Sequence, residues 1–175
     1  MSTTRFERRI FVKRNAAEVL RETLRGVTSG VGGTVHDGGT YICVEGPQFS
    51  TRAESEIFRS WGVSVIGMTA LPEARLAREA EMCYATLAMA TDYDCWHPDH
   101  DHVSADLVVS NLTHNVQTAR AAVAALIPAI ASTRNCTCGR ALNGSVMISP
   151  DQIPAAARER LRPLLERFLV EAAGG

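Results

Sequence analysis

The hydrophobic and polar residues of this chain alternate in blocks that predict helices and strands in turn. Asn15-Ala16-Ala17-Glu18 has the form of a helix capping box, and apolar residues at helical spacing follow it. This pattern predicts a first helix that ends at Gly26. Two short β-prone segments, 34–36 and 40–44, flank Asp37-Gly38-Gly39, a sequence typical of a tight turn. We expect these two segments to form a hairpin.

The middle of the chain continues with alternating helices and strands. Thr51-Arg52-Ala53-Glu54 is a second capping box, and it predicts a helix that closes at Gly62. Residues 63–68 have the apolar character of a buried strand. Pro72 suits the first turn of a helix, so a helix is predicted over residues 73–82.

The last predicted elements fix the fold class. Residues 84–90 are nearly all apolar, as expected for a strand covered on both faces. A long amphipathic helix is predicted over 104–127, and a final helix from the capping box Ser149-Pro150-Asp151-Gln152 to about Glu171. The strand–helix alternation over 41–127 indicates an α/β fold, a layered domain with a mostly parallel or mixed sheet flanked by helices.

The composition is that of a single globular domain. The chain has 175 residues, of which 46% are hydrophobic and 21% charged, enough for a core and unlike a disordered chain. The net charge of −1 lacks the positive excess of dedicated nucleic-acid binders. The longest apolar run, 121–131, is too short to span a bilayer, and no signal peptide is visible. We expect a cytoplasmic protein that binds neither nucleic acid nor membranes.

Three local features leave alternatives open. Residues 1–27 are basic, and they either contact an acidic partner or form a solvated helix face, which we favour. The odd number of cysteines, without an export signal, indicates reduced thiols. Cys136 and Cys138 form a close pair, which either has a redox or metal role or consists of two ordinary thiols. We favour ordinary thiols, because one such pair cannot complete a zinc site. The segment 95–102 is rich in metal-ligand residue types, but a polar surface loop is the simpler interpretation, so no metal is expected.

Polar residues follow three of the predicted strands, where binding sites form in open α/β sheets. These exits are Glu45–Ser50, Gly67–Thr69 and Thr91–Asp94, and we expect them to converge on one crevice. Asp92 and Asp94 lie two residues apart, so they could hold one proton between them. A carboxylic acid kept neutral in this way can donate to a ring nitrogen while its partner accepts from an amino group. The alternative is that Asp94 caps a turn or pairs with an arginine.

Three ordered motifs carry a resemblance to a known enzyme family. They are Glu45-Gly46-Pro47-Gln48-Phe49-Ser50-Thr51-Arg52-Ala53-Glu54-Ser55, Gly67-Met68-Thr69-Ala70-Leu71-Pro72-Glu73 and Ala90-Thr91-Asp92-Tyr93-Asp94-Cys95-Trp96. In order and spacing they resemble the methylthioadenosine phosphorylases of the trimeric purine nucleoside phosphorylase family, over about residues 40–130 and more loosely to Phe168. The resemblance implies phosphorolysis of 5′-methylthioadenosine to adenine and 5-methylthioribose 1-phosphate. It implies a pentosyltransferase of purine and methionine salvage with no cofactor, phosphate being a co-substrate.

The resemblance also implies roles for individual residues. Asp92 would donate a proton towards N7 of the purine, and Asp94 would support recognition of adenine. The remaining implied contacts are Phe49 against the purine, Ser50 beside the base pocket, Met68 on the ribose, Thr69 on the phosphate, and Ala105 and Val108 around the methylthio group. The chemistry agrees with the role of Asp92, because cleavage places negative charge on the departing base. Family members acting on 6-oxopurines carry an asparagine near this position, so Asp92 favours a 6-aminopurine.

The resemblance covers only the C-terminal portion of such a phosphorylase. We expect a basic N-terminal helix and flexible connection over 1–33, and over 34–175 the C-terminal portion of a phosphorylase-type fold that lacks its N-terminal half. Gly30-Val31-Gly32-Gly33 is a poor substitute for the family's phosphate turn, because no strand precedes it and no helix follows. The family's histidine that reaches a neighbouring subunit has no counterpart in Arg5–Ile10. Of the expected phosphate ligands, Thr69 alone remains.

The missing phosphate ligands lower the activity that we expect of this chain. One hydroxyl cannot replace the several charge-assisted donors that phosphate needs, so phosphorolysis by this chain alone is expected to be weak. A missing half would also leave a sheet edge and part of the core open to water. The chain would then be a truncated product or one piece of a split enzyme. Two alternatives stay open, a catalytically degenerate nucleoside-binding or oligomer-partner protein, and a nucleoside hydrolase. The expected partners are a purine nucleoside, phosphate, and either further copies of the chain (a trimer by resemblance) or a chain that supplies the missing half.

Overall fold

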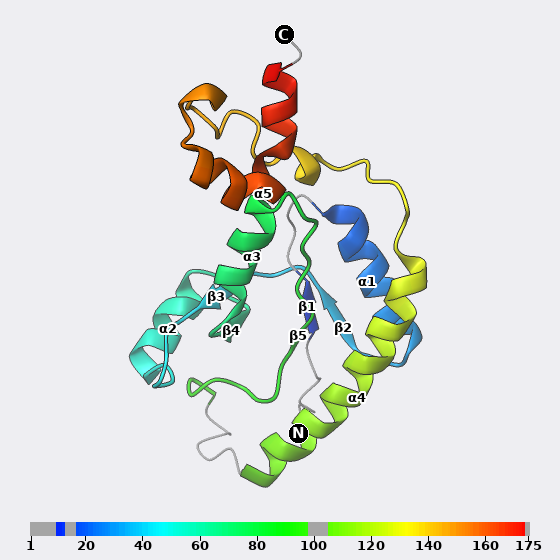
Figure 1. The fold of residues 1–175 in the computed structure, drawn as a ribbon. Helices are drawn as coiled ribbons and strands as arrows, with labels where there is room; N and C mark the ends of the chain where they lie inside the picture. Colours follow the sequence, from blue (N-terminus) through cyan, green and yellow to red (C-terminus); the bar gives the residue numbers. More distant parts are fainter. Residues whose placement is uncertain (1–9, 13–16, 98–104, 174–175) are drawn as a thin grey trace.

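Five short strands form two small sheets in the described part of the chain (Figure 1). The computed structural model describes residues 10–12, 17–97 and 105–173. The first sheet is mixed, in the order β2-β1-β5, and the second is the parallel pair β3-β4. The strands are β1 (Ile10–Val12), β2 (Val35–Asp37), β3 (Tyr41–Cys43), β4 (Val65–Gly67) and β5 (Ala88–Met89). The α/β class and the mixed sheet are as expected, although β5 is shorter than the apolar run 84–90 predicts.

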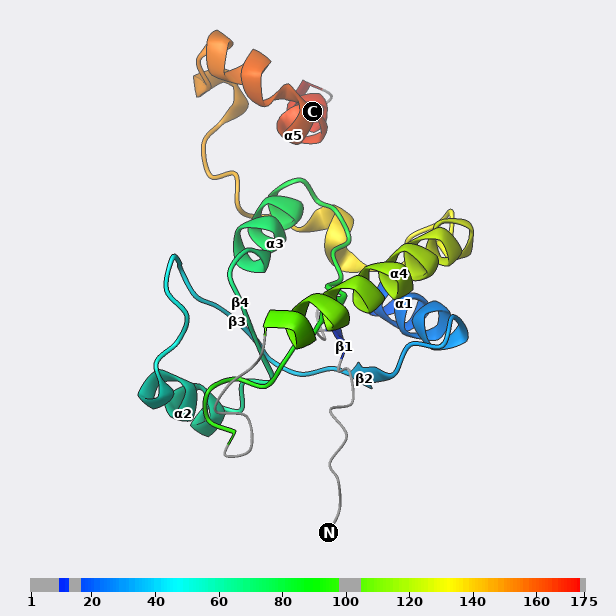
Figure 2. The same ribbon diagram turned by 90° about the horizontal axis from the view of Figure 1, so that it is seen from below.

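Four of the described helices lie around these two sheets, and the last, α5, lies at one end of the molecule, away from them (Figures 1 and 2). The longest helix, α4, runs alongside α1, whereas α2 lies by the β3-β4 pair on the opposite side of the molecule. The helices are α1 (Glu18–Gly30), α2 (Arg52–Ser60), α3 (Ala70–Glu79), α4 (Ala105–Ala129) and α5 (Ala155–Ala173), with 3₁₀ turns at Thr137–Arg140 and Pro150–Gln152.

Helix α1 continues past the residue at which it was expected to end. Gly26 lies inside the helix, and residues 26–30, expected to begin a flexible connection, are helical. A glycine inside a helix costs about 1 kcal/mol relative to alanine, and packing of the helix offsets this cost. Leu24 and Thr28 on either side of Gly26 are both buried, in a helix that contacts α4. The chain turns at Gly32 instead, where φ is +84°.

Two other helix starts differ from the capping pattern. The N-cap of α1 is Ala17, which has no side-chain cap, and Asn15 lies outside the described residues. The box at 149–152 forms a 3₁₀ turn, inside which the Ser149 hydroxyl donates to Asp151. Helix α5 begins three residues later, at Ala155.

The hairpin predicted over residues 34–44 does not form. The turn itself is present, with φ of +82° at Gly38 and +113° at Gly39, conformations that favour glycine. The strands on its two sides pair elsewhere, because β2 lies parallel to β1 and β3 lies parallel to β4. Asp37 at the end of β2 accepts from Arg21 of α1, which ties that strand to the helix. The hydrogen bonds of each strand are therefore supplied by non-local partners that the local turn signal cannot reveal.

Much apolar surface remains exposed among the described residues. The buried apolar side chains are Ala17, Leu24, Ala77, Ala122, Cys138 and Ile153. By contrast, Phe49, Trp61 and Met147 are 85%, 68% and 93% exposed. Apolar exposure on this scale typically marks a surface that a partner or ligand covers. In the described part of the chain, the structure contains no helix with the length and apolarity needed to cross a membrane.

Glu81 connects the C-terminal third of the chain to the end of α3. It has a φ of +53°, unusual for a residue with a side chain. Its carboxylate accepts from the Leu142 amide at 3.1 Å and from Arg167 of α5 at 2.7 Å. Its backbone carbonyl accepts from Arg134 at 3.0 Å. These donors, with the Leu142 amide first, hold the pKa of the Glu81 carboxyl below its usual value.

Candidate functional site

The ends of β3 and β4 lie side by side, as expected for parallel strands. The Val44 amide donates to the carbonyl of Gly67 at 2.9 Å, just where both strands end. Beyond this bond Gly46 lies against Met68, so closely that a Cβ on Gly46 would lie 2.5 Å from the Met68 methyl carbon. Two of the three expected strand exits, Glu45–Ser50 and Gly67–Thr69, therefore meet at one edge.

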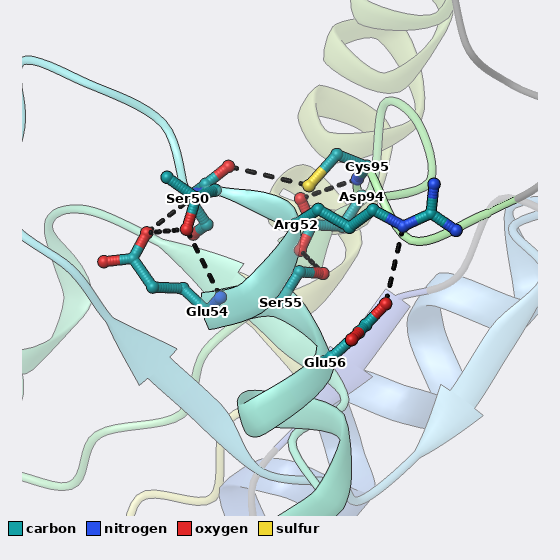
Figure 3. A network of polar contacts seen from close by, with 8 residues as sticks. Ser50, Arg52, Glu54, Ser55, Glu56, Asp94 and Cys95 are labelled. Atoms are coloured by element: carbon teal, nitrogen blue, oxygen red, sulfur yellow. Dashed lines mark hydrogen bonds and ion pairs between the residues drawn. The ribbon is translucent and has the colours of Figure 1, made fainter.

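The third exit comes from the other sheet and is joined to the start of α2 (Figure 3). The carboxylate of Asp94 accepts one hydrogen bond from the Ser55 hydroxyl and another from the Cys95 amide at 2.9 Å. The Cys95 thiol donates to the backbone carbonyl of Ser50 at 3.6 Å. The exit of β5 thus reaches the exit of β3 through contacts of Ser55 and Cys95.

A complete capping box places Ser55 where it can contact Asp94. The Thr51 hydroxyl accepts from the Glu54 amide at 3.3 Å, and the Glu54 carboxylate accepts from the Thr51 amide at 2.7 Å, as its sequence predicts. The Thr51 amide, together with its hydroxyl, lowers the pKa of Glu54. Ser55 follows within the first turn and is 1% exposed. The positive end of the helix dipole also favours a carboxylate such as Asp94 at this end of α2.

Helix α4 fixes the other side of the same exit. Asn115 donates to the carbonyl of Ala90 at 3.0 Å, and Asn111, one turn earlier, donates to that of Thr91 at 2.7 Å. Asn115 is buried, with 4% of its surface exposed. These two amides satisfy carbonyls at the end of β5 and set the direction in which the chain leaves the strand. Asp92, the next residue, is exposed and accepts from the Thr91 hydroxyl at 2.8 Å.

Aromatic contacts hold the rest of this exit against α2. The rings of Tyr93 and His97 stack with their centroids 4.4 Å apart. The guanidinium carbon of Arg59, on α2, lies 3.6 Å from the centroid of the Trp96 ring, a favourable cation–π distance. His97 therefore packs within the exit, while the other two histidines of the expected metal-ligand segment, His100 and His102, lie outside the described residues.

The two carboxylates have different hydrogen-bond donors. Asp94 is held by Ser55 and the Cys95 amide, and Asp92 by Thr91. Asp94 thus has a serine partner on α2 rather than an arginine. It also begins a turn, as the other alternative predicts, because its carboxylate accepts from the Cys95 amide and its carbonyl accepts from the His97 amide at 3.1 Å. The arrangement provides one fixed, half-buried acceptor and one exposed carboxylate beside it, a combination suited to a flat polar ring with both donor and acceptor groups.

Three residues that position these carboxylates were not predicted to do so. Ser55 was part of a motif without an assigned role, and Asn111 and Asn115 were not among the candidates. A signal for the asparagines is present in the sequence, because two amide side chains four residues apart share one face of the helix. Their partners are carbonyls of the strand, which the sequence alone does not place beside α4.

The structure describes the other predicted site residues only in part. Phe49 is 85% exposed and Met68 36% exposed. Thr69 is the N-cap residue of α3, and its side chain makes no capping hydrogen bond. Ala105 and Val108 lie in the first turns of α4, and their side chains are outside the described residues.

A cavity of about 530 Å³ is lined by residues of β3 and α3 and by residues 82–86. Tyr41, Leu71 and Tyr84 contribute to its apolar wall. Its described lining contains none of the predicted site residues. We place the candidate site at the strand ends, where the two carboxylates and the exposed aromatic ring lie, because the described lining of the cavity contains no carboxylate or imidazole for acid–base chemistry.

An α/β fold with carboxylates and an exposed aromatic side chain at the joined strand ends places polar and stacking groups where open α/β sheets bind their ligands. The sequence profile of the phosphorylase superfamily matches residues 4–128. The chain belongs to this superfamily.

Several curated relatives match most of the chain. It is 47% identical over 156 residues to S-methyl-5′-thioadenosine phosphorylase of Koribacter versatilis, covering 89% of this chain and 53% of the relative. It is 51% identical over 138 residues to the enzyme of the same name from Geobacter sulfurreducens, covering 79% and 48%. The chain therefore spans about half the length of the curated relatives it matches.

Solved structures give the same picture. A methylthioadenosine phosphorylase from an antarctic soil metagenomic library aligns with a TM-score of 0.78 at 34% identity, over 91% of this chain and 63% of that one. The methylthioadenosine phosphorylase of Schistosoma mansoni in complex with adenine aligns with a TM-score of 0.63 at 29% identity, over 78% and 54%. The expected phosphorylase-type fold and its partial coverage are both confirmed.

Proposed function

We propose that this chain takes part in phosphorolysis of 5′-methylthioadenosine, giving adenine and 5-methylthioribose 1-phosphate. The observation that supports this most directly is the edge formed by β3, β4 and the exit of β5, where Asp94 is fixed by Ser55 and Asp92 is exposed beside it. The names of the curated relatives point to the same substrate. The compartment we propose is the cytoplasm, which suits five cysteines that are all free thiols.

The base is the part of the substrate that the described residues are best equipped to bind. Asp92 carries the proton that hydrogen-bonds N7 as negative charge develops on the leaving adenine. Asp94 accepts from the adenine amino group, since Ser55 and the Cys95 amide already hold its carboxylate in place. Phe49 stacks on the purine, and its 85% exposure leaves the ring face open to a ligand.

The remaining proposed contacts line the sugar and phosphate. Ser50 borders the base pocket, Met68 contacts the ribose, and Thr69 donates to phosphate from the N-terminus of α3, where the helix dipole favours an anion. Ala105 and Val108, at the start of α4, line the methylthio pocket. Phosphate is a co-substrate, and the reaction needs no further cofactor.

Phosphate binding and assembly extend beyond these residues. A phosphate dianion needs several charge-assisted donors, and Thr69 supplies one hydroxyl. We propose that further copies of the chain, as a trimer, or a second chain complete the phosphate side, and that turnover by the isolated chain is weak. The exposed apolar side chains give such an assembly surfaces to cover.

The experiment is adenine release from 5′-methylthioadenosine by the purified chain, with and without phosphate. Phosphate-dependent release that falls by at least about 100-fold in Asp92→Asn is the expected result, because an amide cannot deliver the proton to N7. Glu56→Gln is the matched control, since this exposed carboxylate on α2 pairs with Arg52 at 3.4 Å and lies outside the proposed site.

Each other outcome has a definite meaning. Release that is equal without phosphate indicates hydrolysis and rejects the phosphorylase. Adenine binding by calorimetry without any release, from a folded sample, supports the nucleoside-binding alternative. Full activity in Asp92→Asn rejects the assigned general acid.

A further inference from the structure

Three cysteines that are far apart in the sequence meet in one cluster. The sulfur atoms of Cys83, Cys136 and Cys138 all lie within 4.8 Å of one another, and those of Cys83 and Cys136 are 3.4 Å apart. Cys83 follows α3, whereas the other two flank the start of the 3₁₀ turn Thr137–Arg140. The sequence shows the close pair, and the fold supplies the third thiol from 53 residues earlier.

The spacing of these sulfurs is that of ligands to one metal ion. A zinc–sulfur bond of about 2.3 Å in a tetrahedral site places neighbouring sulfurs about 3.8 Å apart. The separation of 3.4 Å between Cys83 and Cys136 is close to this value, and none of the three separations exceeds 4.8 Å. The group comprises three thiols and no histidine or carboxylate among the described residues, which selects soft, thiophilic ions over magnesium or calcium.

The surroundings keep the cluster in place while leaving part of it accessible. Cys138 is buried, whereas Cys83 and Cys136 are half-buried. Arg134, just before the pair, donates to the carbonyl of Glu81 at 3.0 Å, and the Glu81 carboxylate accepts from the Leu142 amide just after the pair. The two segments that carry the thiols are therefore fastened to each other on both sides of the cluster. The ligand geometry is held by contacts that do not involve the sulfurs.

We propose that Cys83, Cys136 and Cys138 form a binding site for a thiophilic d¹⁰ metal ion, Zn²⁺ or Cu⁺. Binding converts the coordinating thiols to thiolates and releases their protons to solvent. Three thiolates complete a trigonal Cu⁺ site. With Zn²⁺ they leave a fourth position for water or an external ligand. The site is separate from the carboxylates proposed for nucleoside cleavage, and its test does not depend on enzymatic activity.

The experiment is metal titration of the full chain after reduction and treatment with a chelator. Zn²⁺ binding is measured by calorimetry, Cu⁺ binding by competition with a chromophoric chelator, and the ligand type by the ultraviolet thiolate-to-metal charge-transfer band of the Co²⁺ form. The expected result is one ion per chain and a thiolate band. Binding should weaken by more than about 100-fold in each of Cys83→Ser, Cys136→Ser and Cys138→Ser. This loss exceeds the one usually seen when a residue that only supports a metal ligand is removed.

Matched controls separate this site from adventitious binding. Cys43→Ser removes a half-buried thiol outside the cluster and should leave affinity and spectrum unchanged. Histidines can bind Zn²⁺ but give no thiolate band, so binding without that band overturns the proposal. So does equal affinity in the parent and in the three cluster variants, each checked for folding by circular dichroism, or the absence of binding of both ions. Preference for one ion over the other identifies the occupant.

Discussion

Two strand exits lie at one edge of the proposed site, but they are held in place very differently. They are the exit of β5, residues 91–97, and the exit of β3, residues 44–50. The first is fixed from both sides, by the asparagines of α4 and by Ser55 and Arg59 of α2. The second is mostly exposed and includes Phe49, which is 85% exposed. Its last residue, Ser50, is connected to the β5 exit through its backbone carbonyl.

This difference suggests a division of labour within the proposed site. Groups that recognise a base by hydrogen bonds need fixed directions, because a misplaced acceptor loses most of its interaction. A ring that stacks on the base tolerates small displacements, since stacking depends on area more than on angle. The structure accordingly fixes the acidic exit and leaves the aromatic one open. Four substitutions test this contrast, in order of decreasing effect on stability, and a fifth, Glu54→Gln, tests its dependence on pH.

Asn115→Ala should have the largest effect. It removes a buried amide that donates to the carbonyl of Ala90, which costs about 2 kcal/mol of the free energy of unfolding. Urea denaturation of the parent and variant measures this loss. Gln117→Ala, an exposed position on the same helix, is the control. Equal stability of the parent and Asn115→Ala would show that the β5 exit does not depend on α4.

Ser55→Ala should have the next largest effect. It removes one of the two donors to Asp94 and should lower stability by about 1.5 kcal/mol, because the acceptor is a carboxylate. Adenine affinity should fall as well, since Asp94 keeps only the Cys95 amide. Ser60→Ala, whose hydroxyl bonds to a carbonyl of its own helix, is the control for loss of a serine from α2. If adenine affinity is unchanged, Asp94 is not positioned by Ser55.

Thr51→Ala should cost about 1 kcal/mol, the usual value for a lost N-cap. The other half of this capping box is pH-dependent. The pKa of Glu54 is lowered in the folded chain, so its contribution is present above the ordinary glutamate pKa and is lost as the pH falls through the lowered value. Glu54→Gln should therefore be less stable than the parent at neutral pH and equal to it in acid. A difference that persists in acid would contradict the assignment to charge.

Phe49→Ala should have the smallest effect on stability, below about 0.5 kcal/mol, because the ring is exposed. Adenine affinity should nevertheless fall, since the proposed stacking surface is removed. Thermal unfolding and calorimetric titration measure the two effects on the same sample. A stability loss above 1 kcal/mol would mean that Phe49 packs in solution and that the two exits are less different than described.

The sequence was most informative where a signal is complete within a few residues. The capping box of α2 is such a case, because Thr51 and Glu54 satisfy each other's amides. The polar residues after β3 and β4 are another, because parallel pairing requires both exits to share an edge. The three motifs also identified the family, and the sequence profile of the phosphorylase superfamily confirms it.

The sequence misled where the deciding partner is distant. Gly26 is a helix stop by its own propensity, but α4 packs against α1 and keeps the helix intact. The turn at Gly38 joins strands whose partners are β1 and β4, so the predicted hairpin was wrong. The pair Cys136 and Cys138 lacks a third ligand in the sequence, and Cys83 reaches it only through the fold. The roles of the predicted nucleoside-contacting residues remain predictions.

Glu81 contacts three segments of the chain, and these contacts affect the order in which the chain folds and the way it opens in the native state. Its carboxylate joins residues 61 and 86 positions away in the sequence, so these contacts can form only after long loops have closed. We expect α5 to dock late in folding. In the native state, amide hydrogens of α5 should exchange by detachment of this segment at a lower free energy than those of α1, which packs along α4. Acid neutralises Glu81 and weakens its contact with Arg167, so it should lower the free energy of this opening.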